Sequence, residues 1–312
     1  MTTSEVTLPD GRILAYIDYD PPTASGDGGH ATAASPAKPV LFYCHGFPGS
    51  RVEGDFLKST AQRHGARLIS IDRPGMGLST FQPHRTVLDW PQDVLHLANH
   101  LHIDGFYVVG ASGGAPYVFA CVKALPKTRL LGACVVAGAY PLSLGTDGMS
   151  WPNRILMWTA SSKWFSWVSS LLMDLEFGSV ARDREHPERM TKMMVQVMKS
   201  RPGPDAKCVD SEWATAKLVE ALQESYRQPG DGVNLDIKLI AGDWGFNLAD
   251  LDTEGFNISL WHGGLDANVP VGMARKGAAL IKGAKLRVLE DEAHLSISMN
   301  AQDQFLETLL GR

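Results

Sequence analysis

The sequence predicts an α/β protein with a doubly wound, mostly parallel sheet that is interrupted by one helical insertion. Apolar strand-like segments alternate with helix-like segments from residue 40 to about residue 139, and the alternation resumes after residue 250. Most of these strands are continuous apolar runs, which is typical of strands whose two faces are both covered by helices. Between the two stretches, residues 140–250 have helical periodicity and no convincing strand pattern.

The first part of the chain is expected to open with a hairpin. The turn Pro-Asp-Gly at 9–11 precedes a strand-like run at 13–19. Residues 21–38 are rich in Pro, Gly, Ala, Ser and Thr, and we expect a surface loop there. The further elements before the insertion are strands at 40–43, 67–71, 106–109 and 130–137, and helices at 55–64, 87–101 and 115–125.

The alternating pattern returns after the insertion and completes the sheet domain. Residues 1–139 and 251–312 are therefore assigned to one α/β core, and residues 140–250 to a helical cap. The expected elements after the cap are a strand at 258–261, a helix at 273–281, a strand at 286–289 and a last helix that ends at Leu310.

The composition of the chain argues against several classes of function. The 29 basic and 34 acidic residues give a formal charge of −5 without a long run of either sign, which disfavours nucleic acid or an anionic membrane as a partner. No apolar run approaches the length of a membrane span and the first residues lack a secretory signal, so a cytoplasmic protein is expected. No metal or other cofactor is expected, since no residue spacing is typical of a metal site. The four cysteines are Cys44, Cys121, Cys134 and Cys208; three of them lie in apolar runs, where buried reduced thiols are expected.

The residues that carry chemistry are expected in the loops after the carboxyl ends of the strands, where an open α/β sheet gathers its functional groups. Ser112 stands between an apolar strand and a helix in Gly-Ala-Ser-Gly-Gly, which is the pattern of a nucleophile elbow. Glycine on both sides lets neighbouring chain pass close to the tight turn. An acid, Asp266, and a histidine, His294, follow later strands, so the chain order is Ser, Asp, His.

Four motifs, taken in order along the chain, resemble those of the α/β-hydrolase superfamily, specifically the serine hydrolases with a helical cap. The resemblance covers essentially all of the chain outside 21–38, although it is weak within the cap. The motifs are His-Gly-Phe-Pro-Gly-Ser at 45–50, Asp-Arg-Pro-Gly-Met-Gly-Leu-Ser at 72–79, the elbow at 110–114, and the closing pair Trp-His-Gly-Gly-Leu-Asp at 261–266 with Glu-Ala-His at 292–294.

The resemblance implies a catalytic triad and an oxyanion hole. Ser112 would be the nucleophile, His294 would remove its proton and later protonate the leaving group, and Asp266 would hold the imidazole in the right tautomer. The oxyanion would bind to the backbone N–H groups of Gly113 and Phe47, because the proline after Phe47 has no N–H to give.

Four other residues compete for these roles. His262 and His45 are expected to order their loops through hydrogen bonds and not to transfer protons. Asp147, in the first loop after the strand expected at 130–137, is an alternative acid, but the stretch that follows Asp266 fits the family pattern better. Asp72 lies in a turn rich in glycine and proline, where we expect a structural role.

The cap carries apolar faces that favour a hydrophobic acyl, aromatic or polycyclic substrate. Residues 151–177 are rich in aromatic side chains, and methionines recur at helical spacing in residues 187–199. Most of these side chains are expected to pack the cap onto the core, but some must roof the active site, where methionines and aromatic rings form an adaptable apolar surface. The candidate substrate contacts are Trp158, Met190 and Met194.

The function that follows is hydrolysis of a hydrophobic ester, lactone or thioester through an acyl-enzyme on Ser112. The alternative is a non-hydrolytic member of the same fold that catalyses acyl transfer, carbon–carbon bond cleavage or cyclisation. A non-catalytic small-molecule receptor is the alternative from another class, although a receptor has no need to keep His294 in working geometry. A serine at the elbow argues against epoxide hydrolases and haloalkane dehalogenases, which in this fold use aspartate there.

Overall fold

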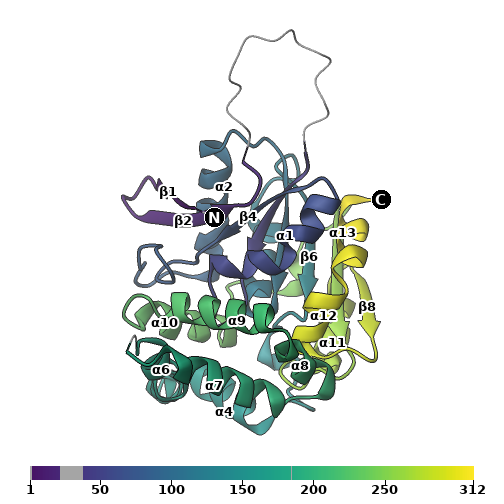
Figure 1. Cartoon of the computed structure of the whole chain (residues 1–312). Coiled ribbons are helices and arrows are strands. Elements are labelled where there is room, and N and C mark those ends of the chain that lie inside the picture. The colour runs from purple at the N-terminus through teal and green to yellow at the C-terminus, as the bar shows by residue number, and fades with distance from the viewer. Residues whose placement is uncertain (1, 22–37, 184) are drawn as a thin grey trace.

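Eight short, mostly apolar segments form the strands of a central sheet in the computed structural model, which describes residues 2–21, 38–183 and 185–312. Helices lie on both sides of the sheet, and further helices gather at one of its ends (Figure 1). The surface loop expected at 21–38 lies, apart from its two end residues, outside the described residues. The strands are β1 Thr3–Thr7, β2 Ile13–Asp18, β3 Val40–Cys44, β4 Arg67–Ile71, β5 Phe106–Ala111, β6 Leu130–Val136, β7 Asn257–Gly263 and β8 Lys285–Leu289.

The sheet is mostly parallel, which confirms the predicted fold class. Its strand order is β1-β2-β4-β3-β5-β6-β7-β8. Neighbours from β4 to β8 are parallel, whereas β1 pairs antiparallel with β2 and β2 pairs antiparallel with β4, so the chain opens with the expected hairpin. Because β3, β5, β6 and β7 run the same way, the loops after their carboxyl ends meet at one end of the sheet.

Two buried apolar layers hold helices onto the two faces of the sheet. Phe42 and Val108 belong to the layer under α2, α3 and α11, whereas Leu41 and Val109 belong to the layer under α1, α12 and α13. Successive residues of a strand therefore point into opposite layers, and both layers exclude water, which explains the continuous apolar runs. The core helices are α1 Gly54–Arg63, α2 Trp90–His100, α3 Ala115–Ala124, α11 Val271–Leu280, α12 His294–Asn300 and α13 Gln302–Leu310.

The residues between β6 and β7 that the structure describes form helices and loops, without a strand. These helices lie together at the end of the sheet (Figure 1). Their own apolar cluster includes the fully buried side chains of Met76 from the core and Met190 from the insertion. They are α4 Trp151–Ser161, α5 Ser166–Met173, the π-helical turn η5 Asp174–Gly178, α6 Ser179–Ala181, α7 Pro187–Lys199, α8 Gly203–Lys207, α9 Glu212–Ser225 and α10 Asp231–Ala241.

Two expected helices differ in detail from the structure. The helix expected over 87–101 begins with a 3₁₀ turn, and the last helix is divided at Ala301, whose backbone is not helical, into α12 and α13. Among the described residues, none of the helices has the length and apolarity needed to cross a membrane. The short 3₁₀ turns are η1 Arg51–Glu53, η2 Val87–Asp89, η3 Ser112–Gly114, η4 Leu142–Leu144, η6 Cys208–Asp210 and η7 Leu248–Asp250.

Candidate active site

The elbow at Ser112 is a strained turn between β5 and η3. Ser112 has a φ of +50°, a left-handed conformation that costs a residue with a side chain about 1–3 kcal/mol. A Cβ at Gly110 would lie 2.5 Å from a methyl group of Val118, and one at Gly114 would overlap the carbonyl oxygen of Cys44. The two glycines therefore let β5, α3 and the end of β3 approach closely enough to hold the strained serine at the end of the sheet.

Ser112, His294 and Asp266 form a continuous chain of hydrogen bonds. The Oγ of Ser112 lies 2.8 Å from Nε2 of His294, and Nδ1 of His294 lies 2.7 Å from Oδ2 of Asp266. The other carboxylate oxygen of Asp266 accepts the backbone N–H groups of Asn268 and Val269 at 2.8 and 2.9 Å. Three side chains from three separate loops thus meet, and the acid that orients the histidine is itself held by its loop.

The pKa values of His294 and Asp266 are shifted in the directions that a proton-accepting histidine requires. Burial by itself lowers the pKa of His294, but the carboxylate of Asp266 outweighs burial and leaves the pKa above its usual value. Burial raises the pKa of Asp266, yet its contacts with His294 and His262 outweigh that effect and hold the pKa well below the usual range. Asp266 is therefore a carboxylate at neutral pH, a charge that favours the protonated form of His294.

The two other histidines near the strand ends are engaged in loop contacts. Nδ1 of His45 lies 2.8 Å from the carbonyl oxygen of Gly46, and its Nε2 accepts the N–H of Arg73 at 3.2 Å. Burial, followed by the charge of Arg73, lowers the pKa of His45 well below its usual value, so this imidazole is neutral. Nε2 of His262 lies 2.7 Å from the carbonyl oxygen of Val269. Both side chains make the contacts of loop-ordering residues.

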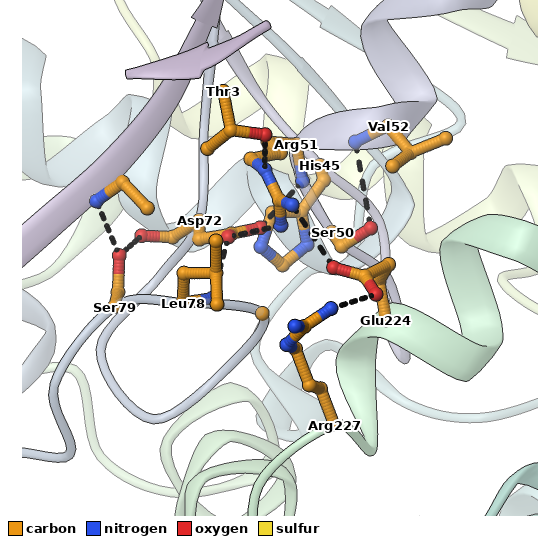
Figure 2. A network of polar contacts seen from close by, with 12 residues as sticks. Thr3, His45, Ser50, Arg51, Val52, Asp72, Leu78, Ser79, Glu224 and Arg227 are labelled. Carbon is orange, nitrogen blue, oxygen red and sulfur yellow. Dashed lines mark hydrogen bonds and ion pairs between the residues drawn. The ribbon is translucent and has the colours of Figure 1, made fainter. Parts of the chain in front are cut away.

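The two competing acids lie in different surroundings. The side chain of Asp147 is 99% exposed and its nearest cation is Arg154, 3.9 Å away. Asp72 is fully buried and accepts hydrogen bonds from the backbone N–H and the guanidinium of Arg51, both at 2.7 Å. Figure 2 shows Arg51 between Asp72 of the core and Glu224 of α9. Asp72 thus has the structural role that its turn predicts, and it helps to fix the insertion to the core.

The residues expected to form the oxyanion hole lie side by side. A Cβ at Gly113 would lie 3.2 Å from the backbone nitrogen of Phe47, so the two peptide groups are close neighbours. Gly113 is the second residue of η3, a position whose N–H has no partner within a helix. None of the hydrogen bonds formed by the described residues uses the N–H of Phe47. Both donors therefore remain available to a bound oxyanion.

A cavity of about 160 Å³ opens beside Ser112 and His294. Its walls are mostly apolar, and the insertion contributes Leu218 of α9. None of the three candidate substrate contacts lines it: Trp158 is 60% exposed and stacks on Phe165, Met190 is fully buried, and Met194 packs against the same cluster as Met190. The apolar walls include Leu57, Val109, Val136, Leu218, Leu295 and Phe305.

Glu53 is a residue of this cavity that the sequence patterns did not indicate. Its Oε2 accepts the N–H of Gly46 at 2.7 Å, and its side chain fills the space beside Gly49. Burial raises the pKa of Glu53 to about 7, despite the opposing effects of the Gly46 N–H and the charge of Arg73. The carboxyl group of Glu53, which lines the cavity, thus holds the loop that carries Phe47 through the N–H of Gly46.

Asp205 of α8 is a second residue that the sequence patterns did not indicate, and it holds the helix that begins with His294. Its Oδ1 accepts the N–H groups of Leu295 and Ser296 at 2.8 and 2.9 Å, and its side chain is buried. Ala293, at the N-cap of α12, has no side-chain oxygen that could take this role. A carboxylate from the insertion therefore caps α12 and adds a negative charge close to the imidazole.

Replacing Asp205 with asparagine should shift the acid limb of the pH profile of kcat/KM. Asparagine keeps an oxygen for the two N–H groups but removes a charge that raises the pKa of His294, whereas Arg201 and Asp266 keep their effects. The pKa of His294 then falls, so the neutral form that accepts the serine proton persists to lower pH, by about half a pH unit or more. The profile of Asp210→Asn, at an exposed acid of η6, should match the wild type; equal profiles for all three proteins would contradict the expectation.

No three His, Cys, Asp or Glu side chains converge on a metal-binding arrangement within residues 2–21, 38–183 and 185–312.

Comparisons with known proteins place the chain in a family. The family model described as the alpha/beta hydrolase fold matches residues 39–300. The bifunctional esterase/perhydrolase of Acinetobacter calcoaceticus is 28% identical over 143 residues, which cover 46% of this chain and 47% of that relative. The chain thus aligns with about half the length of this curated relative.

Solved structures with low sequence identity share the whole fold. A hydrolase from Pseudomonas aeruginosa has a TM-score of 0.63 at 18% identity and aligns over 99% of this chain and 98% of its own. The esterase EaEST from Exiguobacterium antarcticum has a TM-score of 0.61 at 16% identity over 99% and 98% of the chains. The enol-lactonase from Burkholderia xenovorans has a TM-score of 0.62 at 15% identity over 99% and 100%. Since the family model matches most of the sequence and the fold agrees, the chain belongs to the α/β-hydrolase fold family.

Proposed function

We propose that this protein is a serine hydrolase that cleaves hydrophobic carboxylic esters, lactones or thioesters through an acyl-enzyme on Ser112. The observation that carries the proposal is the hydrogen-bond chain from Ser112 through His294 to Asp266 at the mouth of an apolar cavity. The printed names of the similar proteins, which include esterases and an enol-lactonase, favour the same class of substrate.

The arrangement of the site supports the following acylation step. Neutral His294 takes the proton of Ser112 as Oγ attacks the carbonyl carbon of the substrate, and the carbonyl oxygen becomes an oxyanion. The N–H groups of Phe47 and Gly113 stabilise that charge, and Asp266 stabilises the imidazolium. His294 then gives its proton to the leaving alcohol as the bond between the carbonyl carbon and the leaving oxygen breaks.

Deacylation repeats the same steps with water. His294 takes a proton from a water molecule, whose oxygen attacks the acyl carbon and forms a second oxyanion at the same two N–H groups. When the bond to Ser112 breaks, His294 returns the proton to Oγ and the free acid leaves. Each turnover therefore consumes one water and restores the resting protonation of the triad.

The shape of the site favours a compact apolar group beside the nucleophile. An apolar cavity of roughly 150 Å³ is large enough for a benzene ring, so the cavity of about 160 Å³ accepts an aromatic ring or a short acyl chain. Phe56, Met299 and Gln302 also border a more open, mixed polar and apolar cleft of about 510 Å³ towards the solvent. The remainder of the substrate has room in that cleft.

Activity against a series of p-nitrophenyl esters tests this function. We expect kcat/KM to rise by at least about tenfold from acetate to hexanoate or benzoate, since each buried CH₂ contributes about 0.8 kcal/mol, and to fall for palmitate, which exceeds the cavity. Leu218→Ala should move the optimum to longer chains, whereas Leu280→Ala, at an exposed leucine of α11, should leave it unchanged. A higher kcat/KM for short polar esters such as a glycolate would contradict the hydrophobic specificity, and the absence of any ester, lactone or thioester hydrolysis would refute the proposal.

A further inference from the structure

Arg73 is a fully buried cation that lies between the insertion and the loop of the proposed oxyanion hole. Its Nη1 donates to the carbonyl oxygen of His45, and its Nη2 donates to the carbonyl oxygen of Gly46 at 2.8 Å. The same guanidinium pairs with the buried carboxylate of Asp236 in α10 through Nη2 at 2.8 Å and Nε at 3.1 Å. One planar fork thus holds two backbone carbonyls of the core and one carboxylate of the insertion.

The contact with Gly46 fixes the direction of the donor at Phe47. The carbonyl of Gly46 and the N–H of Phe47 belong to the same peptide unit, which is planar, and in a trans peptide these two groups point in opposite directions. Arg73 holds the carbonyl at 2.8 Å, so the N–H of Phe47 points away from the guanidinium, and the nitrogen that carries it lies close to Gly113. Rotating this peptide would leave a buried N–H of the charged guanidinium without its acceptor, which is unfavourable.

The other contacts of the loop are made by Glu53 and His45. Glu53 accepts the N–H of Gly46, which belongs to the preceding peptide unit and does not set the direction of the Phe47 N–H. Nδ1 of His45 also lies 2.8 Å from the Gly46 oxygen, but its Nε2 is in turn held by the backbone N–H of Arg73. His45 thus supports the same carbonyl, whereas the guanidinium of Arg73 joins that carbonyl to Asp236 of the insertion.

We propose that Arg73 is a positioning residue of the oxyanion hole and that Asp236 of the insertion holds it in place, so that the insertion helps to build the hole as well as to enclose the substrate. The inference rests on the proposed function, since an oxyanion hole matters only if Ser112 attacks a carbonyl group. The role is one of orientation, because Arg73 is fully buried and acts through the peptide it holds.

Arg85 offers a matched control for Arg73. It is also buried and pairs with Oδ1 of Asp236 at 2.6 Å. Its guanidinium lies over the ring of Tyr117 at 5.5 Å, compared with 4.7 Å for Arg73. Tyr117 is a third partner of Asp236 and donates a hydrogen bond to it. Each single arginine variant therefore leaves the carboxylate paired, and the two differ in their contacts with the carbonyls of His45 and Gly46.

The test compares Arg73→Met, Arg73→Lys and Arg85→Met with the wild type. For each we would measure kcat and KM on the best ester, inhibition by an alkyl boronic acid that forms a tetrahedral adduct with serine, and the thermal unfolding temperature. We expect Arg73→Met to lower kcat by about 10- to 1,000-fold, as for loss of an oxyanion donor, while KM stays within about threefold. The inhibition constant of the boronic acid should rise in parallel with the loss of kcat. Arg85→Met should lose stability but keep kcat within about threefold.

Arg73→Lys covers the case in which Arg73→Met does not fold. Lysine keeps the buried positive charge opposite Asp236, but a single ammonium group cannot reproduce the planar fork that holds two carbonyls and a carboxylate, so kcat should fall at least about tenfold while the protein stays folded. Full kcat in Arg73→Lys, or equal loss of kcat in Arg73→Met and Arg85→Met, would overturn the inference. If the wild type hydrolyses esters and Ser112→Ala does not, such a result refutes the role of Arg73 alone; if the wild type has no such activity, the proposed function fails first.

Discussion

Ser112→Ala should reduce kcat/KM for ester hydrolysis by at least about a thousandfold, because the substitution removes the oxygen that forms the acyl-enzyme. The substitution removes one oxygen whose hydrogen-bond partner is His294, so the fold and the cavity should be retained. Steady-state kinetics on the preferred p-nitrophenyl ester, together with the thermal unfolding temperature, measure both effects.

Ser70→Ala is the matched control for this variant. Ser70 is another buried serine, on β4, and its hydroxyl has no hydrogen-bond partner among the described residues. Its replacement should leave kcat/KM within about twofold of the wild type, since a buried hydroxyl without a partner contributes little. If Ser112→Ala keeps more than about a thousandth of the wild-type activity while it remains folded, Ser112 is not the nucleophile.

Asp266→Asn should lower kcat by about ten-thousandfold, the effect known for the corresponding change in a serine protease triad. An asparagine amide placed 2.7 Å from Nδ1 of His294 can donate a hydrogen bond to that nitrogen, which favours the tautomer that cannot accept the serine proton. The imidazolium formed during the reaction also loses the carboxylate that stabilises it. Presteady-state acylation rates would show the loss directly.

Asp147→Asn decides between the two candidate acids. Asp147 lies in the loop after β6, but its side chain is almost fully exposed and is not among the hydrogen-bond partners of His294. We expect Asp147→Asn to keep wild-type kcat within about twofold. A large loss in Asp147→Asn with near-normal activity in Asp266→Asn would assign the orienting acid to Asp147.

The fold class and the place of the loops that carry the candidate triad could be predicted from the sequence because both follow from local patterns. Runs such as 40–44 and 106–111 are apolar on both faces, and such runs form the inner strands of a sheet covered by helices. Gly110 and Gly114 indicate a turn that only small residues permit. Parallel strands then bring the loops after them to the same end of the sheet, where Ser112, Asp266 and His294 meet.

The surfaces of the insertion could not be predicted in the same way. Helical spacing shows which residues share a face, but not what that face contacts. Met190 and Met194 share a face that packs within the insertion's own cluster, and Trp158 remains largely exposed beside Phe165. Leu218, which reaches the cavity, lies in a helix whose pattern offered no reason to choose it. The role of Trp158, Met190 and Met194 as substrate contacts stays a prediction.

The polar residues that hold the Phe47 loop and the start of α12 could not be identified from sequence patterns either. Arg73 and Asp236 are 163 residues apart, and Asp205 is 90 residues from Leu295. No local motif records such a contact: the motif at 72–79 contains Arg73 but not Asp236, and an isolated charged residue is usually expected at the surface. The signal appears only in the fold, where each of these side chains is buried and paired.

The acyl-enzyme on Ser112 is tested most directly by a fluorophosphonate probe followed by peptide mass spectrometry. The probe phosphonylates a serine that is activated by a neighbouring base, so the wild-type protein should carry one label, on the peptide that contains Ser112, and Ser112→Ala should carry none. Asp266→Asn should be labelled far more slowly, because His294 then lacks the group that orients it. A label on another residue, or undiminished labelling of Ser112→Ala, would contradict the proposed mechanism.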